Sequence, residues 1–375
     1  MAKSKKDAGG ECLIATVDAE QFAKRLGFVQ GALPRRNTVP ILDCVLLTAG
    51  PGLVRLAVTN LDQMSEVTLQ SDTKAAGAIC VDARRLLAVV SRFSGEMLIA
   101  QEGTSLKLTG GRARAELPVL PAGDFAGMRG PEEDGETFEI ASGALASGFA
   151  SVMHACSKEE TRYYLNGVYM QPDGGDLKFT ATDGTRLASL KVTSGLPGGT
   201  AFAPCIVPDA MLRDFVKFCE RADGPVAMTV SDDRLQLSAA GETHITKLID
   251  GTFPDYERVI PKGPGTRINV AIADLKRAVA VAMTGSTEKS MAVRFEAEEG
   301  RLTCRSREEG QWAEGIVEGT DIPPCVAFGL NGKLPLQALE ACRGETVELV
   351  VIDPASPVRF ETGDELRQVV MPLRV

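Results

Sequence analysis

Apolar side chains recur along this chain at the spacing of amphipathic helices. Three segments place them at positions i, i+4 and i+7, which form one face of a helix: residues 18–33, 141–156 and 271–286. A second set with the same helical periodicity occupies residues 81–93, 207–222 and 330–344. The pattern therefore predicts six helices in three pairs.

Between the two helices of each pair, apolar and polar residues alternate as in half-buried strands, at residues 53–69, 177–192 and 301–317. Another strand-rich stretch follows each second helix, at residues 97–120, 226–249 and 346–373. The whole pattern recurs with a period of about 125 residues, which indicates an internal repeat. The predicted fold class is α+β, with three copies of one unit that has two helices and antiparallel sheets of roughly eight short strands.

Stretches rich in Gly, Pro and charge lie between the repeats, at residues 127–139 and 260–270. They predict an N-terminal domain over 1–129, a central domain over 130–263 and a C-terminal domain over 264–375. We expect residues 1–11 to form a disordered tail, because they precede the first predicted strand.

Composition narrows the class of protein. The chain has 375 residues, of which 44% are hydrophobic, and a net charge of −9. It has no apolar run long enough for a signal peptide or a membrane span, so we expect a cytoplasmic protein. Its nine cysteines are far apart and show no metal-ligand spacing, so we interpret them as reduced thiols, mostly in the core.

The stretch Phe179–Leu187 carries the most suggestive chemistry, because an Asp-Gly-Thr follows an apolar run there. Phosphotransferases of the haloacid dehalogenase type place a nucleophile in such a stretch, but the nucleophile position is Ala181 here. The stretch also repeats a strand end found in the other two units, which favours a structural turn at Asp183. The two histidines, His154 and His244, lie in unrelated segments, and we interpret each as a surface or helix-end residue. No catalytic residue and no metal ligand is therefore predicted.

Five stretches carry a family resemblance, and they occur in the order 35–47, 160–170, 180–188, 250–261 and 368–375. They resemble the bacterial DNA polymerase III beta subunit, the sliding clamp, and the resemblance runs from about Cys12 to Val375. It implies a head-to-tail homodimer of six domains, with the helices lining a hole for double-stranded DNA and the sheets on the outside. Such a ring needs no cofactor and no catalytic group, since it holds a polymerase on DNA by topology.

The resemblance also implies partners: the alpha subunit of DNA polymerase III, the clamp loader and other proteins that carry a clamp-binding motif. A clamp paralogue that acts as a peptide-binding scaffold, without a core role in replication, would have the same sequence signature. A phosphotransferase built around Asp183 is the other alternative.

Basic residues on the predicted helices are consistent with contacts to DNA phosphates, although a solvated helix face has the same pattern. The candidates are Lys24, Arg25, Arg84, Arg92, Arg213, Lys217, Arg221, Lys276 and Arg277. The resemblance adds Arg36, Tyr163 and Tyr164 as loop residues that contact DNA.

The resemblance further implies a pocket for short apolar peptides between the second and third domains. Its residues are Leu165, Thr182, Gly184, Thr185, Arg186, Leu187, Pro254, Arg258, Val259, Val369, Met371, Pro372, Leu373 and Arg374. Thr185 stands where many relatives have His. Without the resemblance, plain core residues are the less favoured alternative for Leu165, Leu187 and Val259.

The expected subunit interface joins the third domain to the first domain of the neighbour. We expect Glu308 and Glu309 to face Lys74 and the strand around Leu106 and Leu108. Such charge pairs set orientation more than affinity.

Overall fold

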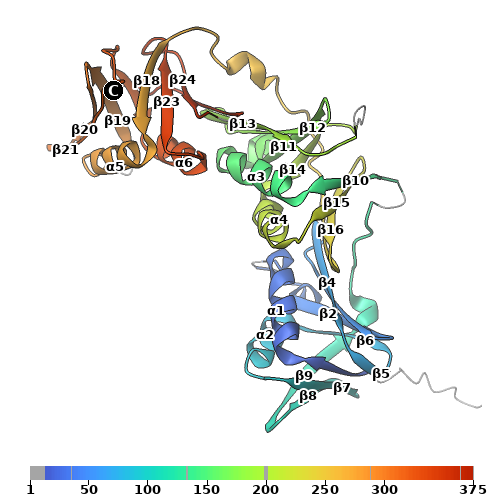
Figure 1. Cartoon of the computed structure of the whole chain (residues 1–375). Coiled ribbons are helices and arrows are strands. Elements are labelled where there is room, and N and C mark those ends of the chain that lie inside the picture. The colour runs from blue at the N-terminus through green and yellow to red at the C-terminus, as the bar shows by residue number, and fades with distance from the viewer. Residues whose placement is uncertain are drawn as a thin grey trace, which may run out of the picture. The chain divides into compact units, whose positions relative to one another are not determined.

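The computed structural model describes residues 13–34, 36–131, 134–197, 202–287, 289–363 and 365–374 (Figure 1). The predicted tail at 1–11 and Cys12 lie outside these residues. Within the described part, the order of helices and strands is that of a unit repeated three times.

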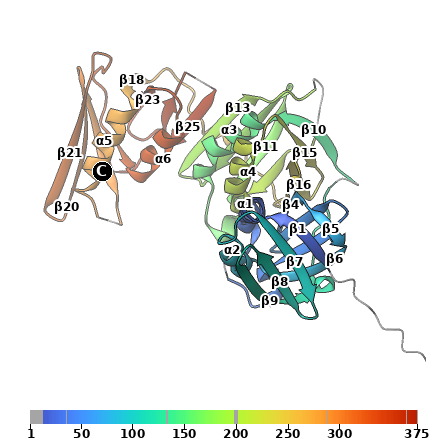
Figure 2. The ribbon, with the colours of Figure 1, turned by 60° about the horizontal axis from the view of Figure 1, so that its bottom comes forward.

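All six predicted helices are confirmed. Their bounds are Ala19–Val29 for α1, Ala83–Val90 for α2, Ser142–Val152 for α3, Asp209–Arg221 for α4, Ile272–Met283 for α5 and Lys333–Ala341 for α6. In each repeat the two helices lie side by side (Figures 1 and 2).

Local chemistry explains where the helices begin. The Asp18 and Asp82 side chains cap α1 and α2, since each accepts a hydrogen bond from a backbone N–H three residues on. Pro335 falls in the first turn of α6, where a missing N–H costs no helical hydrogen bond. Helix α2 ends at Val90, so Arg92 lies beyond the helix on which it was predicted.

The chain packs as two compact units. Unit one comprises the residues up to Phe138 together with Pro225–Lys247, and unit two comprises Glu139–Gly224 and the residues from Leu248 onward. The split falls within the central repeat, because the strands that end this repeat pair with the first repeat.

Unit one is built on a 13-stranded sheet in the order β10-β15-β16-β17-β4-β3-β2-β6-β9-β8-β7-β1-β5. The strands are β1 Ile14–Asp18, β2 Cys44–Gly50, β3 Leu53–Thr59, β4 Gln63–Gln70, β5 Asp72–Ala75, β6 Gly77–Asp82, β7 Glu96–Glu102, β8 Ser105–Gly110, β9 Ala113–Pro121, β10 Glu136–Ala141, β15 Pro225–Val230, β16 Arg234–Ala239 and β17 Glu242–Lys247. Phe22 and Leu26 of α1 and Leu86 of α2 are fully buried in the same apolar core.

Unit two contains an eight-stranded sheet, β14-β11-β12-β13-β25-β24-β23-β18, and a four-stranded sheet, β21-β20-β19-β22. The bounds are β11 Gly167–Asp173, β12 Asp176–Thr182, β13 Arg186–Thr193, β14 Cys205–Pro208, β18 Thr266–Ala271, β19 Ala292–Glu298, β20 Arg301–Glu308, β21 Gln311–Glu318, β22 Phe328–Asn331, β23 Thr346–Val351, β24 Val358–Glu361 and β25 Leu366–Val370. The larger sheet joins two repeats, since β13 of the central repeat pairs with β25 of the last.

The central helix packs closely on its sheet. A Cβ added to Gly148 of α3 would lie 2.3 Å from the ring of Phe179 on β12, so only glycine fits there. Phe149 meets the same ring edge-on, with the centroids 4.9 Å apart. This packing holds β12, and with it the start of the β12–β13 hairpin, against α3.

One sequence-based prediction is wrong. His244 is not a surface residue: it is fully buried on β17, where Nδ1 lies 2.7 Å from Ser65 Oγ and Nε2 lies 2.8 Å from a Glu242 carboxylate oxygen. The strand pairing of β17 with β4 places Ser65 directly opposite His244. His154 is at a helix end as predicted, in the 3-10 turn Met153–Ala155 after α3.

The predicted core placement of the cysteines is confirmed for most of those described, since six of the eight are buried. Burial raises the pKa of the Cys205 thiol to about 12 and that of Cys304 to about 12, so both stay protonated at neutral pH. Among the described residues, no helix is long and apolar enough to cross a membrane.

Candidate functional site

Asp183 closes the β12–β13 hairpin as a structural residue. Its Oδ1 accepts hydrogen bonds from the backbone N–H groups of Thr185 and Arg186, at 2.8 and 3.1 Å. Its Oδ2 lies 3.0 Å from Nε of Arg186. The preceding Thr182 donates from Oγ1 to the Arg186 carbonyl, at 2.6 Å. Every carboxylate oxygen of Asp183 is therefore engaged in shaping the turn.

The same turn recurs in the first repeat, between β3 and β4. Thr59 Oγ1 donates to the Gln63 carbonyl at 2.8 Å, and Asn60 Oδ1 accepts from the N–H groups of Asp62 and Gln63. Leu61 and Gly184 occupy the equivalent left-handed position, with φ of 77° and 87°. This confirms the predicted turn interpretation of Asp183.

The third repeat closes its hairpin differently. Strands β20 and β21 are joined by only Glu309 and Gly310, both with positive φ, as in a two-residue hairpin. A tight turn is thus present in each repeat, but only the first two share the Thr-Asx geometry.

A cavity of about 200 Å³ lies beside the Asp183 turn, wholly within unit two. Nine of the residues implied by the resemblance line it: Leu165, Thr182, Gly184, Arg186, Leu187, Pro254, Val259, Val369 and Met371. They come from the 3-10 helix Glu160–Leu165, the β12–β13 hairpin, the connection before β18 and the end of β25. Segments more than 200 positions apart in sequence therefore converge on one site.

The cavity wall is largely apolar, and its floor is part of a small core. Leu165, Leu187 and Val369 are buried in a cluster with Tyr256 and Phe253. Val259 and Met371, by contrast, are 53% and 42% exposed. The plain-core alternative is therefore wrong for Val259, while Leu165 and Leu187 are core residues that also line the cavity.

Sequence reasoning missed two lining residues, Asp255 and Tyr256. The ring of Tyr256 meets the rings of Phe253 and Tyr169 edge-on, and Lys178 Nζ lies 5.1 Å from its centre. Both missed residues lie in the stretch 250–261 that carries the resemblance. The available signal was Tyr256 itself, an aromatic residue two positions after the predicted pocket residue Pro254.

Arg186 is the cationic group in the cavity wall, which also contains Asp255, and the Arg186 side chain is 12% exposed. Its guanidinium is held by Asp183 on one side and by a hydrogen bond from Nη1 to the Gln337 side chain of α6 on the other. This double anchoring orients the remaining N–H donors of Arg186 and leaves little rotamer freedom to lose when a ligand binds.

The other predicted pocket residues lie outside the cavity lining. Thr185 contributes its carbonyl, which accepts from the Met371 N–H at 2.8 Å, and Leu373 N–H donates to the Gly329 carbonyl at 2.7 Å. Arg258 is exposed and pairs with Asp255 at 2.6 Å. Pro372 and Arg374 also lie beyond the lining, on the surface segment that follows β25.

The predicted DNA-contacting residues are mostly exposed. Exposed members are Lys24, Arg36, Arg84, Tyr163, Arg213, Lys217, Arg221 and Arg277, and half-buried members are Arg25, Tyr164 and Lys276. Arg213, Lys217 and Arg221 follow one another every four residues along α4, so they share one face of this helix. The guanidinium of Arg84 already makes two hydrogen bonds within the protein, to Asp43 at 3.0 Å and to the Pro34 carbonyl at 2.8 Å, so fewer of its donors remain for phosphate.

The assignment of Leu106 and Leu108 to a subunit interface is corrected. Both side chains are fully buried in the unit-one core, and β8 is paired on both sides by β7 and β9. The outward positions of this strand are the alternate residues Ser105, Lys107 and Thr109.

The other predicted interface residues, Lys74, Glu308 and Glu309, carry charges at or near the surface. Lys74 and Glu309 are exposed. Glu308 accepts hydrogen bonds from the Thr287 N–H and the Ser290 hydroxyl, both at 2.7 Å, and these bonds hold the pKa of its carboxyl below the usual range.

The described residues contain no group of three or more His, Cys, Asp or Glu side chains arranged to hold a metal ion. The site is instead an apolar cavity with one oriented arginine, on a scaffold of three like repeats, which is the architecture of a binding protein.

Comparison with known proteins identifies the protein family to which the chain belongs. Three family models match in sequence order: the N-terminal domain of the DNA polymerase III beta subunit over 14–129, its central domain over 139–255 and its C-terminal domain over 257–374. The chain belongs to the DNA polymerase III beta subunit family. Members of this family are sliding clamps, non-catalytic processivity factors of the polymerase holoenzyme, and this is the function of the chain.

Individual relatives agree over nearly the whole chain. The beta sliding clamp of Caulobacter vibrioides is 34% identical over 96% of this chain and 99% of its own length. That of Escherichia coli K12 is 30% identical with the same coverage. A crystal structure of the clamp of Bartonella birtlesii bound to griselimycin superposes with a TM-score of 0.90, at 30% identity, over 97% of this chain and 100% of that one.

Proposed function

We propose that two copies of this chain form a head-to-tail ring around double-stranded DNA in the cytoplasm, and that the cavity beside Asp183 binds apolar peptide segments of its partners. The partners are the alpha subunit of DNA polymerase III, the clamp loader and other proteins with a clamp-binding motif. The observation that carries the proposal is the convergence of nine predicted pocket residues on one cavity of about 200 Å³ in a chain of three like repeats.

Two edge strands support ring closure by a second copy. Strand β5 ends the 13-stranded sheet, and β21 ends the four-stranded sheet. On β21 the side chains of Trp312 and Ile316 are 64% and 42% exposed, which is costly unless a partner covers them. We assign the interface to these edges, with Lys74 on β5 and Glu309 in the turn before β21, and extend it to the outward face of β8.

Electrostatics support a bore that attracts DNA without reading sequence. The chain has a net charge of −9, yet α4 presents Arg213, Lys217 and Arg221 on one face. Contacts of such residues with phosphates are independent of sequence and weaken as salt displaces them. Loop residues Arg36, Tyr163 and Tyr164 complete the proposed DNA-contacting set.

The test is retention of the purified protein on circular and linearised DNA after loading by its clamp loader, at moderate salt. Persistence on the circle with loss from the linear ends is expected for a topological ring. Equal loss from both would refute encirclement and favour a peptide-binding scaffold.

A further inference from the structure

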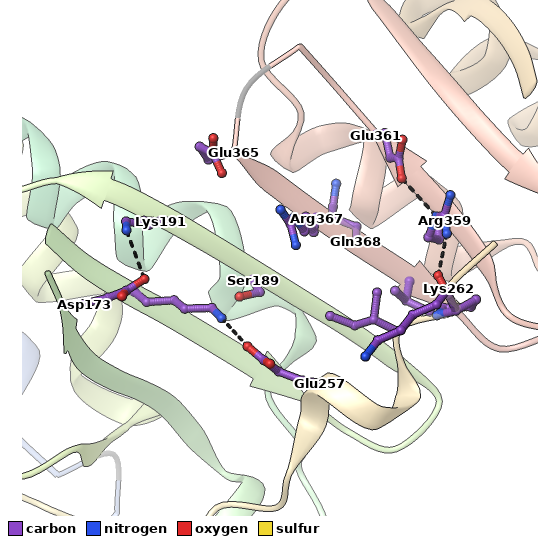
Figure 3. Close-up of a pocket in the computed structure, with 14 residues that line it drawn as sticks. Asp173, Ser189, Lys191, Glu257, Lys262, Arg359, Glu361, Glu365, Arg367 and Gln368 are labelled. Carbon is purple, nitrogen blue, oxygen red and sulfur yellow. Dashed lines mark hydrogen bonds and ion pairs between the residues drawn. The ribbon is translucent and has the colours of Figure 1, made fainter. Parts of the chain in front are cut away.

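A second, polar cavity of about 440 Å³ lies on the same sheet of unit two (Figure 3). Its walls come from β11, β12, β13, β24 and β25 and from the connection that follows Tyr256. Nothing in the ring or in the apolar cavity accounts for this concentration of charge.

The lining carries five cations and four anions, and three of the anions are already paired. Figure 3 shows the Lys191–Asp173 pair, with an N to O distance of 3.0 Å. Lys178 pairs with Glu257 at 2.8 Å. The third pair joins Arg359 to Glu361 at 2.9 Å.

Two cations remain for a ligand. Lys262 and Arg367 are exposed, and neither forms an ion pair with another described residue. The remaining anion, Glu365, is likewise exposed, so the unpaired groups in the cavity carry one net positive charge. Lys178, and to a lesser degree Lys262 and Arg367, lower the pKa of Glu257, but Lys262 and Arg367 do so at a distance and are not held in a direct ion pair. An acidic side chain that enters here can therefore form a direct pair with either of them.

The polar cavity adjoins the apolar one. Val369 lines both cavities, and along β13 Leu187 faces the apolar cavity while Ser189 and Lys191, on the same face, line the polar cavity. Since residues two apart in a strand are separated by about 6.6 Å, three or four extended residues reach from one cavity into the other.

The connection between the cavities is fixed in place. Tyr256 and Val259 face the apolar cavity, whereas Glu257 and Lys262 face the polar one. Arg359 holds this connection on the sheet through hydrogen bonds to the carbonyls of Pro261 and Gly263, the latter at 3.2 Å.

We propose that the polar cavity binds acidic side chains that flank the apolar segment of a partner peptide, with Lys262 and Arg367 as the residues that recognise them. This inference rests on the proposed function of the apolar cavity. It adds a specificity element, because a partner with acidic flanks gains contacts that an equally apolar partner with neutral flanks lacks.

The experiment uses two synthetic fluorescent peptides with the same Leu- and Phe-rich segment, one flanked by three glutamates and the other by three glutamines. Binding to the full-length protein is measured by fluorescence anisotropy at low and high salt. The variants are Arg367→Gln and Lys262→Gln, with Arg343→Gln as the matched control, because Arg343 is exposed in the same unit and lines neither cavity.

The expected result is that the glutamate-flanked peptide binds about fivefold more tightly at low salt. This preference should vanish in Arg367→Gln, weaken in Lys262→Gln, persist in Arg343→Gln and shrink at high salt. Equal affinity for both peptides, with no effect of Arg367→Gln, would overturn the proposal while leaving the apolar site intact. Failure of both peptides to bind would instead refute the apolar site, and this inference with it.

Discussion

Asp183 and Arg186 form one unit, in which the carboxylate of Asp183 accepts from the backbone N–H of Arg186 and also holds its guanidinium at 3.0 Å. Both side chains are mostly buried. Asp183→Ala is therefore expected to destabilise unit two by about 1–3 kcal/mol, because four donors lose their acceptor: the N–H and hydroxyl of Thr185 and the N–H and Nε of Arg186. Urea unfolding followed by circular dichroism measures this loss.

Asp183→Asn is the matched control for this pair. Asparagine keeps an oxygen for the turn but loses the charge that holds Arg186, so we expect a cost of about 1 kcal/mol or less and weaker peptide binding. An Asp183→Asn variant as unstable as Asp183→Ala would show that charge, rather than turn geometry, dominates.

Leu61 and Gly184 occupy the same left-handed position in two repeats, but only one of them is glycine. Leu61→Gly is expected to stabilise unit one by about 0.5–1 kcal/mol, because release of left-handed strain outweighs the added freedom of the unfolded chain. The reciprocal change, Gly184→Ala, is expected to destabilise unit two, since a Cβ would lie 2.8 Å from Nη1 of Arg162. Thermal unfolding midpoints that move in the same direction for both variants would contradict this prediction.

His154 makes stability depend on pH. Burial, reinforced by the positive charge of Arg186, lowers the pKa of this imidazole from 6.5 to about 4. Between pH 6.5 and pH 4 the unfolded chain therefore binds more protons than the folded chain. The contribution of His154 to the free energy of unfolding is complete above pH 6.5 and is lost as pH falls towards 4. We expect a loss of about 2 kcal/mol between pH 7 and pH 5.

The measurement for His154 is urea unfolding of the native protein and of His154→Gln at both pH values. Other titrating groups are common to the two proteins, so the difference between them isolates this histidine. If both proteins showed the same pH dependence of the free energy of unfolding, groups other than His154 would be responsible for it.

Met371 is, with Val259, one of two exposed large apolar residues that line the apolar cavity. Met371→Ala is expected to weaken binding of an apolar peptide about tenfold, and deletion of residues 371–375 to abolish it. Leu98→Ala removes a comparably exposed apolar side chain from unit one and should leave the affinity unchanged. An unaltered dissociation constant for the deletion variant would refute the assigned site.

Arg36 is exposed in the loop after α1. Arg36→Ala is expected to weaken loading onto DNA without changing the oligomeric state, and to reduce the slope of log K against log salt by about 0.9 if one phosphate contact is lost. Arg112, exposed between β8 and β9, provides the matched arginine control. Retention equal to that of the native protein would remove Arg36 from the DNA-contacting set.

Local patterns were sufficient for much of this fold. Helical spacing predicts all six helices, and the turn-forming Asp-Gly pair predicts the structural role of Asp183. Both signals act within a few residues of sequence, so they are visible in a single chain.

Contacts between residues far apart in sequence determine which side chains are buried, and these contacts cannot be predicted from local patterns. The burial of His244 depends on Ser65, which lies 179 positions away on a paired strand. Alternation placed Leu106 and Leu108 on one face of their strand, but only the packed core determines that this face points inward. Tyr256 likewise joins the cavity through rings on other segments.

The β13–β25 pairing has a counterpart in the β4–β17 pairing. The two pairings differ in the side chains just beyond the last paired residues, which are Thr185 and Met371 in one and Asp62 and Lys247 in the other. Met371 N–H bonds the Thr185 carbonyl just as Lys247 N–H bonds the Asp62 carbonyl, but in the latter pair the side chains also form an ion pair at 2.9 Å. If the repeats arose by gene duplication, the two junctions began alike. Divergence then left an exposed methionine at one junction and a mutually satisfied charge pair at the other, so only the second junction is closed by an ion pair between its own side chains.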